Sequence, residues 1–288
     1  MTRDRNCKTG AIPLSLGYSP CPNDTFIFYG LVHGRVKMDG IVLEQPVLED
    51  VETLNLWALQ TKLQVSKLSF HALGHVLDDY VMLGAGAALG RGCGPLLVAG
   101  DQSADRDIAQ WTIAVPGRYT TAAMLLGLWR PNLARTVVVR FDRIMEQVSQ
   151  GRVDAGVIIH ESRFTYPEFG LHCVMDLGQW WEEKTGLPIP LGCIAARRNL
   201  PVDVLERLEQ GIRESVRWSM AHPESCSQYI HEHAQEMAPD VLRSHIALYV
   251  NDYTVDLQEE GRMAVETLLR MGQEASLFPA STLSATWK

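Results

Sequence analysis

In Ile12-Pro-Leu-Ser-Leu-Gly-Tyr-Ser-Pro-Cys-Pro-Asn-Asp-Thr25, a short apolar run leads directly into a turn that contains two prolines. The run 12–18 predicts a β-strand, and the prolines predict that the strand ends there. Asn23 or Asp24 can then cap a helix, because both side chains accept hydrogen bonds from first-turn N–H groups. A strand, a turn and a helix in this order form the first part of a βαβ unit.

The same alternation of apolar runs and helical periodicity continues along the chain. Further strands are predicted at 41–47, 65–70, 80–83, 96–99, 111–115, 136–140, 155–159 and 189–196. Helical patterns lie between most of these strands, which predicts mostly parallel sheets covered by helices. From residue 202 onward the pattern is almost entirely helical. These helices have no sheet of their own, so we expect them to pack on the first α/β unit.

A polar, charged segment at 100–107 separates two α/β units. The fold class is therefore predicted as α/β with two lobes, the first of which is discontinuous. The predicted boundaries are 1–10 for a flexible N-terminal extension, 11–103 plus 192–288 for lobe one, and 104–191 for lobe two. Crossing segments near Gly100 and Ile194 would leave a cleft between the lobes, and such clefts bind small ligands.

Composition excludes several classes of protein. Lys and Arg number 26 against 34 Asp and Glu, so the formal net charge is −8, and 46% of the residues are hydrophobic. An acidic globular chain of this kind is not expected to bind nucleic acid or a membrane. The N-terminus shows no apolar export signal, and the six cysteines form no C-x-x-C pair. We therefore expect a cytoplasmic protein with free thiols.

Familiar cofactor and metal motifs are missing from the sequence. The glycine-rich segment 84–90 has Leu89 where a G-x-G-x-x-G motif needs its third glycine, and neither a P-loop nor a G-x-S-x-G motif occurs. His71 and His75 are four residues apart on a predicted helix, which is a spacing that can hold a metal. No third ligand is evident, so partly buried histidines are the favoured interpretation. We expect no metal site and no cofactor.

Two segments of lobe one carry polar groups toward the predicted cleft. Ser19, Asn23 and Asp24 follow the first strand, and the helix after them aims its free N–H groups at the cleft. The alternative is a stiff turn with a capping residue. The segment Lys67-Leu68-Ser69 ends the strand 65–70 and offers an ammonium and a hydroxyl to an acidic ligand. A solvated lysine at the edge of a sheet is the alternative there.

Two segments of lobe two do the same. Thr120, Thr121 and Ala122 begin a helix after the strand 111–115, so their hydroxyl and N–H groups can hold a carboxylate. The alternative is that a threonine only caps the helix. His160 follows the strand 155–159 and is a candidate general base, because an imidazole titrates near neutrality. The alternative is a structural histidine, which is the usual role of a lone histidine.

Seven motifs occur along the chain in a specific order. They are SPCPNDTFIF, LEDVETLN, KLSFHAL, AALGRGCGP, VPGRYTTA, IIHESRFTY and WWEEKTGLPIPLG. Together they resemble the 1,4-dihydroxy-6-naphthoate synthase family of the futalosine pathway to menaquinone, from about residue 12 to residue 200. The combination of the first motif with HESRFTY is highly specific.

The resemblance implies a periplasmic-binding-protein-like (type II) fold with two lobes and a closing cleft. It also implies a lyase without a cofactor that converts cyclic dehypoxanthine futalosine to 1,4-dihydroxy-6-naphthoate and releases the sugar-derived fragment. His160 matches the family's proton acceptor. The segments 67–69 and 121–122 match its substrate-contacting segments. Ser19, Asn23, Asp24 and Thr120 are assigned to the cleft beside them.

Other functions stay open at this point. A solute-binding protein would have the same cleft without chemistry, and chorismate dehydratase of the same pathway shares the fold that the resemblance implies. A third interpretation is a cytoplasmic sensor domain, which would require a fused output module. The expected partner is the small-molecule substrate, and the oligomeric state is open between a monomer and a homodimer. For Cys21 we favour a packing role, since the neighbouring sequence offers no base. Glu161 could orient His160, although adjacent side chains usually point apart.

Overall fold

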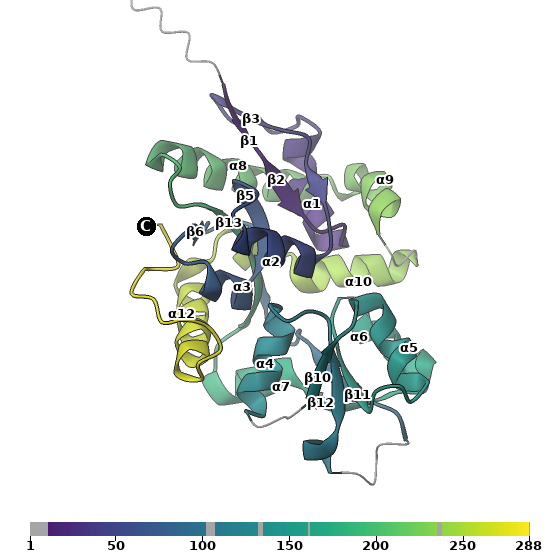
Figure 1. Ribbon diagram of the computed structural model, residues 1–288. Helices are drawn as coiled ribbons and strands as arrows, with labels where there is room; N and C mark the ends of the chain where they lie inside the picture. Colours follow the sequence, from purple (N-terminus) through teal and green to yellow (C-terminus); the bar gives the residue numbers. More distant parts are fainter. Residues whose placement is uncertain (1–10, 102–106, 132–134, 161, 235–237, 288) are drawn as a thin grey trace, which may run out of the picture.

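The computed structural model describes residues 11–101, 107–131, 135–160, 162–234 and 238–287. The predicted extension 1–10 and Glu161 lie outside these residues. Within them the chain forms two lobes, each built on its own mixed β-sheet, and the lobes are stacked along the long axis of the molecule (Figure 1).

The sheet of lobe one has the strand order β4-β2-β5-β13-β6, and β7 pairs with β13 beside β6. Its strands are β2 Leu16–Tyr18, β4 Val47–Leu48, β5 Val65–Ser69, β6 Tyr80–Met82, β7 Ala88–Gly90 and β13 Ile189–Arg197. β2 is parallel to β4 and β5, whereas β13 runs antiparallel to β5, β6 and β7. A separate parallel pair joins β1 Ile12–Leu14 to β3 Ile41–Leu43.

The sheet of lobe two has the strand order β10-β9-β11-β8-β12. Its strands are β8 Leu96–Ala99, β9 Thr112–Val115, β10 Arg135–Val138, β11 Ala155–Ile158 and β12 His172–Asp176. β9 is parallel to β10 and β11, and β8 is antiparallel to β11 and β12. The expectation of mostly parallel sheets is therefore wrong for β8 and β13, which are the strands that follow the passages between the lobes.

The passages themselves also differ from the prediction. We expected 96–99 in lobe one, but β8 pairs within the sheet of lobe two. The chain leaves the first sheet after Gly90 and returns to it at Ile189. An apolar run such as 96–99 has the same pattern in either sheet, so periodicity cannot assign it to one of them.

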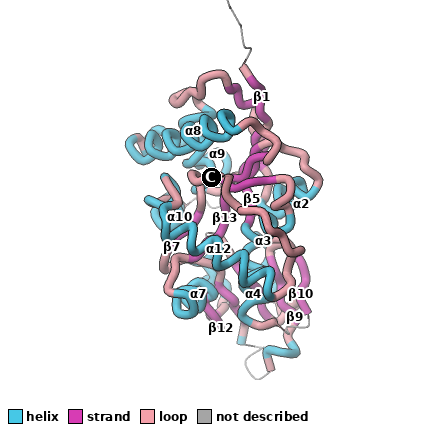
Figure 2. The backbone as a smooth tube through the Cα atoms, turned by 90° about the vertical axis from the view of Figure 1, so that its left-hand side faces the viewer, coloured by secondary structure: helices cyan, strands magenta, loops and turns pink. Residues whose placement is uncertain are grey.

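Helices cover both sheets, and the C-terminal helices pack on lobe one as expected. The helices are α1 Pro22–Val32, α2 Val51–Leu59, α3 Phe70–His75, α4 Thr121–Trp129, α5 Ile144–Ser149, α6 Ser162–Thr165, α7 Leu177–Thr185, α8 Val202–Ala221, α9 Pro223–His233, α10 Pro239–Tyr249, α11 Asp252–Val255 and α12 Gln258–Glu274. Short 3₁₀ turns occupy Ile108–Gln110, Phe141–Arg143 and Tyr166–Phe169. α8, α9 and α10 contact α1, while α12 lies against α3 of lobe one and α4 of lobe two (Figure 2).

One hydrophobic core connects the lobes on the side of α12. It includes Leu68 of β5, Ile113 of β9 and Leu268 of α12, all of which are fully buried. Trp181 of α7 is also fully buried in this core, and its indole N–H donates to the carbonyl of Pro188 at 3.0 Å. Since interiors of this kind are close-packed, this side of the molecule fixes how the two sheets stand relative to each other.

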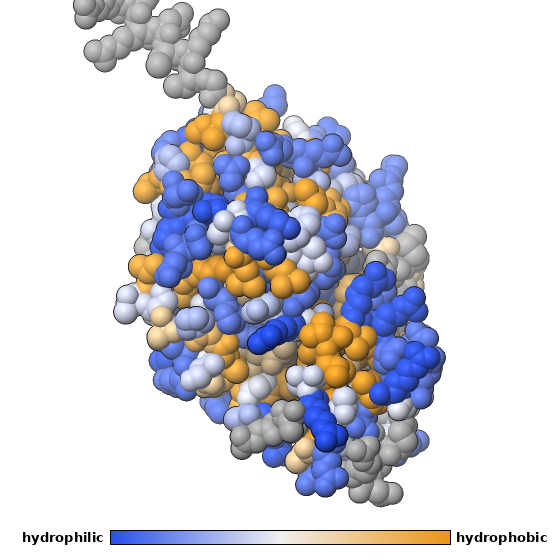
Figure 3. Space-filling model, in the orientation of Figure 1, coloured by the Kyte–Doolittle hydropathy of each residue, from blue (hydrophilic) through white to orange (hydrophobic). Residues whose placement is uncertain are grey.

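The surface is mixed. Figure 3 shows apolar patches among polar side chains on one face, and the most exposed large apolar residues are Val42, Val138 and Val202. Single exposed apolar side chains are ordinary in folded domains. None of the described helices is long and apolar enough to cross a membrane.

Candidate active site

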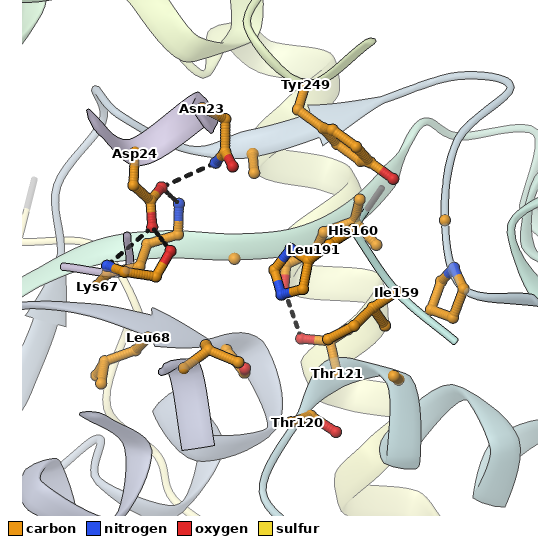
Figure 4. A pocket seen from close by; sticks show the side chains of 18 of the residues that line it. Asn23, Asp24, Lys67, Leu68, Thr120, Thr121, Ile159, His160, Leu191 and Tyr249 are labelled. Carbon is orange, nitrogen blue, oxygen red and sulfur yellow. Dashed lines mark hydrogen bonds and ion pairs between the residues drawn. The ribbon is translucent and has the colours of Figure 1, made fainter. Parts of the chain in front are cut away.

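The cleft between the lobes is lined by all ten residues that the sequence assigned to it. These residues are Ser19, Asn23, Asp24, Lys67, Leu68, Ser69, Thr120, Thr121, Ala122 and His160. The cleft together with its open mouth holds about 660 Å³ of space. The ten residues come from four separate segments, which the two sheets bring to one place (Figure 4).

A buried ion pair lies on the lobe-one side of the cleft. Nζ of Lys67 lies 2.5 Å from Oδ1 of Asp24, and the two side chains are 6% and 2% exposed. Oδ1 also accepts from the Asn23 amide at 2.8 Å, and Oδ2 accepts from the Ser19 hydroxyl at 2.7 Å. The ammonium is therefore already neutralised by a carboxylate. Lys67 contributes a fixed, paired charge to this wall rather than a spare cation for an acidic ligand.

This network also corrects the predicted cap of α1. The helix begins at Pro22 with Cys21 as N-cap, and Cys21 makes no side-chain capping bond. Asn23 and Asp24 lie inside the first turn, with their side chains in the network just described. Proline at the first helical position removes one of the four N–H groups that have no partner within the helix.

The opposite side of the cleft is the first turn of α4. Thr120 caps this helix, since its hydroxyl accepts from the Ala123 N–H at 3.2 Å and donates to the Gly117 carbonyl at 2.9 Å. The Thr121 hydroxyl accepts from the Phe70 N–H at 2.9 Å and donates to the Leu191 carbonyl at 2.6 Å. Both hydroxyl protons are thus used within the protein. The groups that α4 offers to a ligand are the first-turn N–H groups of Thr121 and Ala122, which have no acceptor within the helix and carry its positive dipole end.

Ser69 contributes a hydroxyl from the end of β5. Its Oγ accepts from the Asn55 amide at 3.1 Å, and its N–H donates to the Asn55 carbonyl oxygen at 3.0 Å. A serine that accepts in this way keeps its own O–H for another acceptor. Leu68 and Ala122 add apolar surface to the same cleft, together with Ile159 and Leu191.

His160 reaches the cleft from lobe two. It follows β11 by two residues and has φ of 57°, which is the left-handed region. This conformation costs a histidine roughly 1–2 kcal/mol, so the surrounding structure must hold it. The Phe141 ring lies edge-on at 5.1 Å between centroids, and Sγ of Cys21 lies 3.5 Å from Nδ1. The favoured packing role of Cys21 is therefore incomplete, because the base that its neighbouring sequence lacks comes from the other lobe.

Two residues of α10 were missed by the sequence analysis. His245 and Tyr249, one helical turn apart, both line the cleft. His245 is buried, its Nε2 lies 3.0 Å from the Asn23 carbonyl oxygen, and its ring is stacked on His160 with 6.2 Å between centroids. Burial holds the pKa of His245 well below its usual value, and electrostatic interactions with His160 and Lys67 act in the same direction. The signal available in sequence was the four-residue spacing of His245 and Tyr249 on a predicted helix.

The histidine pair of α3 lies apart from this cleft. His71 and His75 have ring centroids 5.2 Å apart, and burial is the main cause that lowers the pKa of each. His71 donates from Nε2 to the Leu277 carbonyl at 3.3 Å. Among the described residues, no group of three His, Cys, Asp or Glu side chains is placed to hold a metal ion.

Two lobes, two passages between them and a ligand cleft define a periplasmic-binding-protein-like fold. A structure of the periplasmic aliphatic sulphonate binding protein from Escherichia coli has a TM-score of 0.61 at 12% identity and covers 93% of this chain and 89% of that one. A crystal structure of a protein from Archaeoglobus fulgidus has a TM-score of 0.86 at 37% identity, with 92% of this chain and 98% of that one covered.

The family follows from sequence comparisons. Residues 14–274 match the family described as menaquinone biosynthesis. The 1,4-dihydroxy-6-naphthoate synthase of Thermus thermophilus is 52% identical over 268 residues, which are 93% of this chain and 97% of that protein. The enzyme of the same name from Streptomyces coelicolor is 46% identical over 272 residues, which are 93% of this chain and 95% of that protein. The chain belongs to this menaquinone biosynthesis family, which confirms the resemblance found in its motifs.

Proposed function

We propose that the protein is a 1,4-dihydroxy-6-naphthoate synthase that converts cyclic dehypoxanthine futalosine to 1,4-dihydroxy-6-naphthoate and the sugar-derived fragment. Two relatives that share about half of its residues carry this name. The observation that carries the mechanism is the position of His160, which enters the cleft between hydrogen-bond donors from both lobes.

In this proposal His160 is the general base. Its imidazole takes a proton from the substrate, and the electron pair left behind drives the cleavage of a carbon–carbon bond. The product of this cleavage is an aromatic ring system. A well-placed general base contributes roughly 10²–10⁴-fold to a rate. The chain's own side chains supply the base, and we propose no cofactor.

The substrate carboxylate and developing oxyanion charge need donors. We assign the Ser69 hydroxyl and the N–H groups of Thr121 and Ala122 to this task. The Thr120 and Thr121 hydroxyls already donate to carbonyl groups of the protein. Donors fixed before the reaction stabilise developing charge without reorganisation. The ion pair of Lys67 and Asp24 keeps the lobe-one wall in place.

We also propose a cytoplasmic location. Cys93, Cys173, Cys193 and Cys226 are free thiols. Free thiols in a chain of this size are typical of a reducing compartment.

Mass spectrometry of product formation tests the function. Purified wild type and His160→Asn are incubated with cyclic dehypoxanthine futalosine, and chorismate serves as the competing substrate. Asparagine tolerates the left-handed backbone of position 160, so the variant should fold, which circular dichroism checks. We expect dihydroxynaphthoate from wild type and a loss of at least a hundredfold in the variant.

Each other outcome points elsewhere. Normal turnover by His160→Asn would make His160 structural and place the base at another residue. Binding of the compound by wild type without turnover would favour a solute-binding protein. Turnover of chorismate instead would favour chorismate dehydratase.

A further inference from the structure

Helix α2 carries two polar residues that face the other lobe. Glu52 and Asn55 are three residues apart, and therefore lie on the same face of the helix. They belong to the LEDVETLN motif, to which the mechanism above gives no task. Neither residue lines the cleft, yet both contact segments that do.

The Glu52 carboxylate is seated on the turn that precedes α4. Its two oxygens accept from the Tyr119 N–H at 3.1 and 3.2 Å. A Cβ atom added to Gly117 would lie 2.4 Å from the Glu52 carboxylate, so the glycine is what lets the side chain come this close. Burial is the main cause that raises the pKa of Glu52, while the Tyr119 and Arg118 N–H groups and the Asn55 amide lower it. The contact thus joins lobe one to the loop that positions Thr121 and Ala122.

Asn55 extends the same contact to the other substrate segment. It is fully buried, and its amide donates to the Ser69 hydroxyl at 3.1 Å and to the Tyr119 carbonyl at 3.3 Å. Its carbonyl oxygen accepts from the Ser69 N–H at 3.0 Å, and its amide also donates to Glu52 at 3.2 Å. One side chain therefore ties the end of β5, the turn before α4 and the Glu52 carboxylate together.

We propose that Glu52 and Asn55 are positioning residues that set the distance between Ser69 and the first turn of α4. This proposal rests on the proposed function, in which those two segments hold one substrate from opposite lobes. A displacement of about 1 Å at such donors can cost about a hundredfold in rate, although the residues that cause it never touch the substrate. We call the pair with its contacts on Gly117 and Tyr119 the α2 clasp.

The first experiment compares Glu52→Ala with Glu52→Gln. Glutamine keeps an oxygen that accepts from the Tyr119 N–H, whereas alanine leaves that N–H without its acceptor. We expect Glu52→Ala to raise KM about tenfold or more, because losing a hydrogen bond to a charged group has an effect of this size. The KM of Glu52→Gln should stay within about threefold of wild type, because the hydrogen bond to the Tyr119 N–H remains. The matched control is Glu44→Ala, an exposed glutamate of the same lobe.

Hydrogen exchange gives a readout that does not depend on the reaction. Amides of residues 117–123 should exchange faster in Glu52→Ala than in wild type, and at the wild-type rate in Glu52→Gln and Glu44→Ala. Wild-type exchange and wild-type KM in Glu52→Ala would overturn the proposal. If wild type makes no dihydroxynaphthoate, the proposed function fails, while the exchange data still decide whether the clasp holds the turn.

Gly117→Ala provides an independent test, because the added methyl group displaces the Glu52 carboxylate while residue 52 remains a glutamate. Position 117 is not in the left-handed region, and the three nearest atoms to an added Cβ all belong to Glu52. We expect Gly117→Ala to reproduce the KM and exchange changes of Glu52→Ala, and the double variant to be no worse than either single one. Changes in KM and exchange rate that add in the double variant would show that Gly117 and Glu52 act separately, and would overturn the proposal.

Discussion

The sulfur of Cys21 lies 3.5 Å from Nδ1 and 3.8 Å from Nε2 of His160, across the cleft between the lobes. Cys21 is the N-cap of α1 in lobe one, whereas His160 follows β11 of lobe two. A contact between these two side chains needs both lobes at their present separation. The proposed base therefore contacts a weakly polar side chain of lobe one. Substituting Cys21 measures how much this contact contributes to the activity of His160.

We predict a small effect of Cys21→Ala on the reaction. A typical hydrogen bond contributes about 0.5–1.5 kcal/mol net, and a thiol is a weak partner, so kcat/KM should fall less than tenfold. Cys21→Ser should be closer to wild type, because the hydroxyl can still contact the imidazole. Steady-state kinetics measure both, with the exposed Cys173→Ala as control. A loss as large as that of His160→Asn would place the thiol in the chemistry itself.

The ion pair of Lys67 and Asp24 should behave as a unit in folding. Breaking a buried pair by removing one partner costs about 3–5 kcal/mol, because the other charge stays buried without compensation. We expect Asp24→Asn and Lys67→Met each to lower the free energy of unfolding by this order. The double variant should lose less than the sum, as residues in contact are not additive.

Urea unfolding of the two single variants and the double variant measures this coupling. Glu274→Gln is the matched control, because its pair with Arg270 is exposed and should be worth about 0.5 kcal/mol. Additive losses in the double variant would mean that Lys67 and Asp24 stabilise the fold through separate contacts.

The sequence predicted local structure better than the assignment of strands to sheets. The helical pattern predicted from residue 202 onward begins with α8 at Val202–Ala221, because a long amphipathic pattern is set by its own residues. The run 96–99 was predicted as a strand and is one, but it pairs in the other sheet. Pairing depends on segments far away in the chain, which a pattern over four residues does not encode.

The candidate site divides in the same way. Ten residues chosen from four motifs all line one cleft, since each motif lies where a strand ends or a helix begins at the edge of the cleft. The capping role of Asn23 and Asp24 was wrong, because the Asp24 carboxylate binds Ser19, five residues earlier, and Lys67, 43 residues later. His245 was missed, as its contact with Asn23 spans 222 positions of sequence.

His245 also gives a pH dependence to stability. Its neighbour Asn23 donates its amide N–H to Asp24, so the Asn23 oxygen must accept from Nε2–H of His245. Burial, followed by electrostatic interactions with His160 and Lys67, holds the pKa of His245 well below the usual value. An unfolded histidine titrates near pH 6.5, so the unfolded chain takes up this proton first as the pH falls. Stability contributed by neutral His245 is therefore present above pH ~6.5 and is lost progressively below it.

We predict that His245→Gln flattens this dependence. Glutamine can still donate to Asn23 but does not titrate, so the slope of unfolding free energy between pH 6.5 and 5.5 should fall by about 1 kcal/mol per pH unit. Urea unfolding at pH 7.5, 6.5 and 5.5 measures the slope, and the exposed His222→Gln is the control. His71 and His75, whose pKa values are also lowered, remain in every variant and cancel from the comparison. Equal slopes for wild type and His245→Gln would mean that His245 binds its proton over the same pH range in the folded protein as in the unfolded chain.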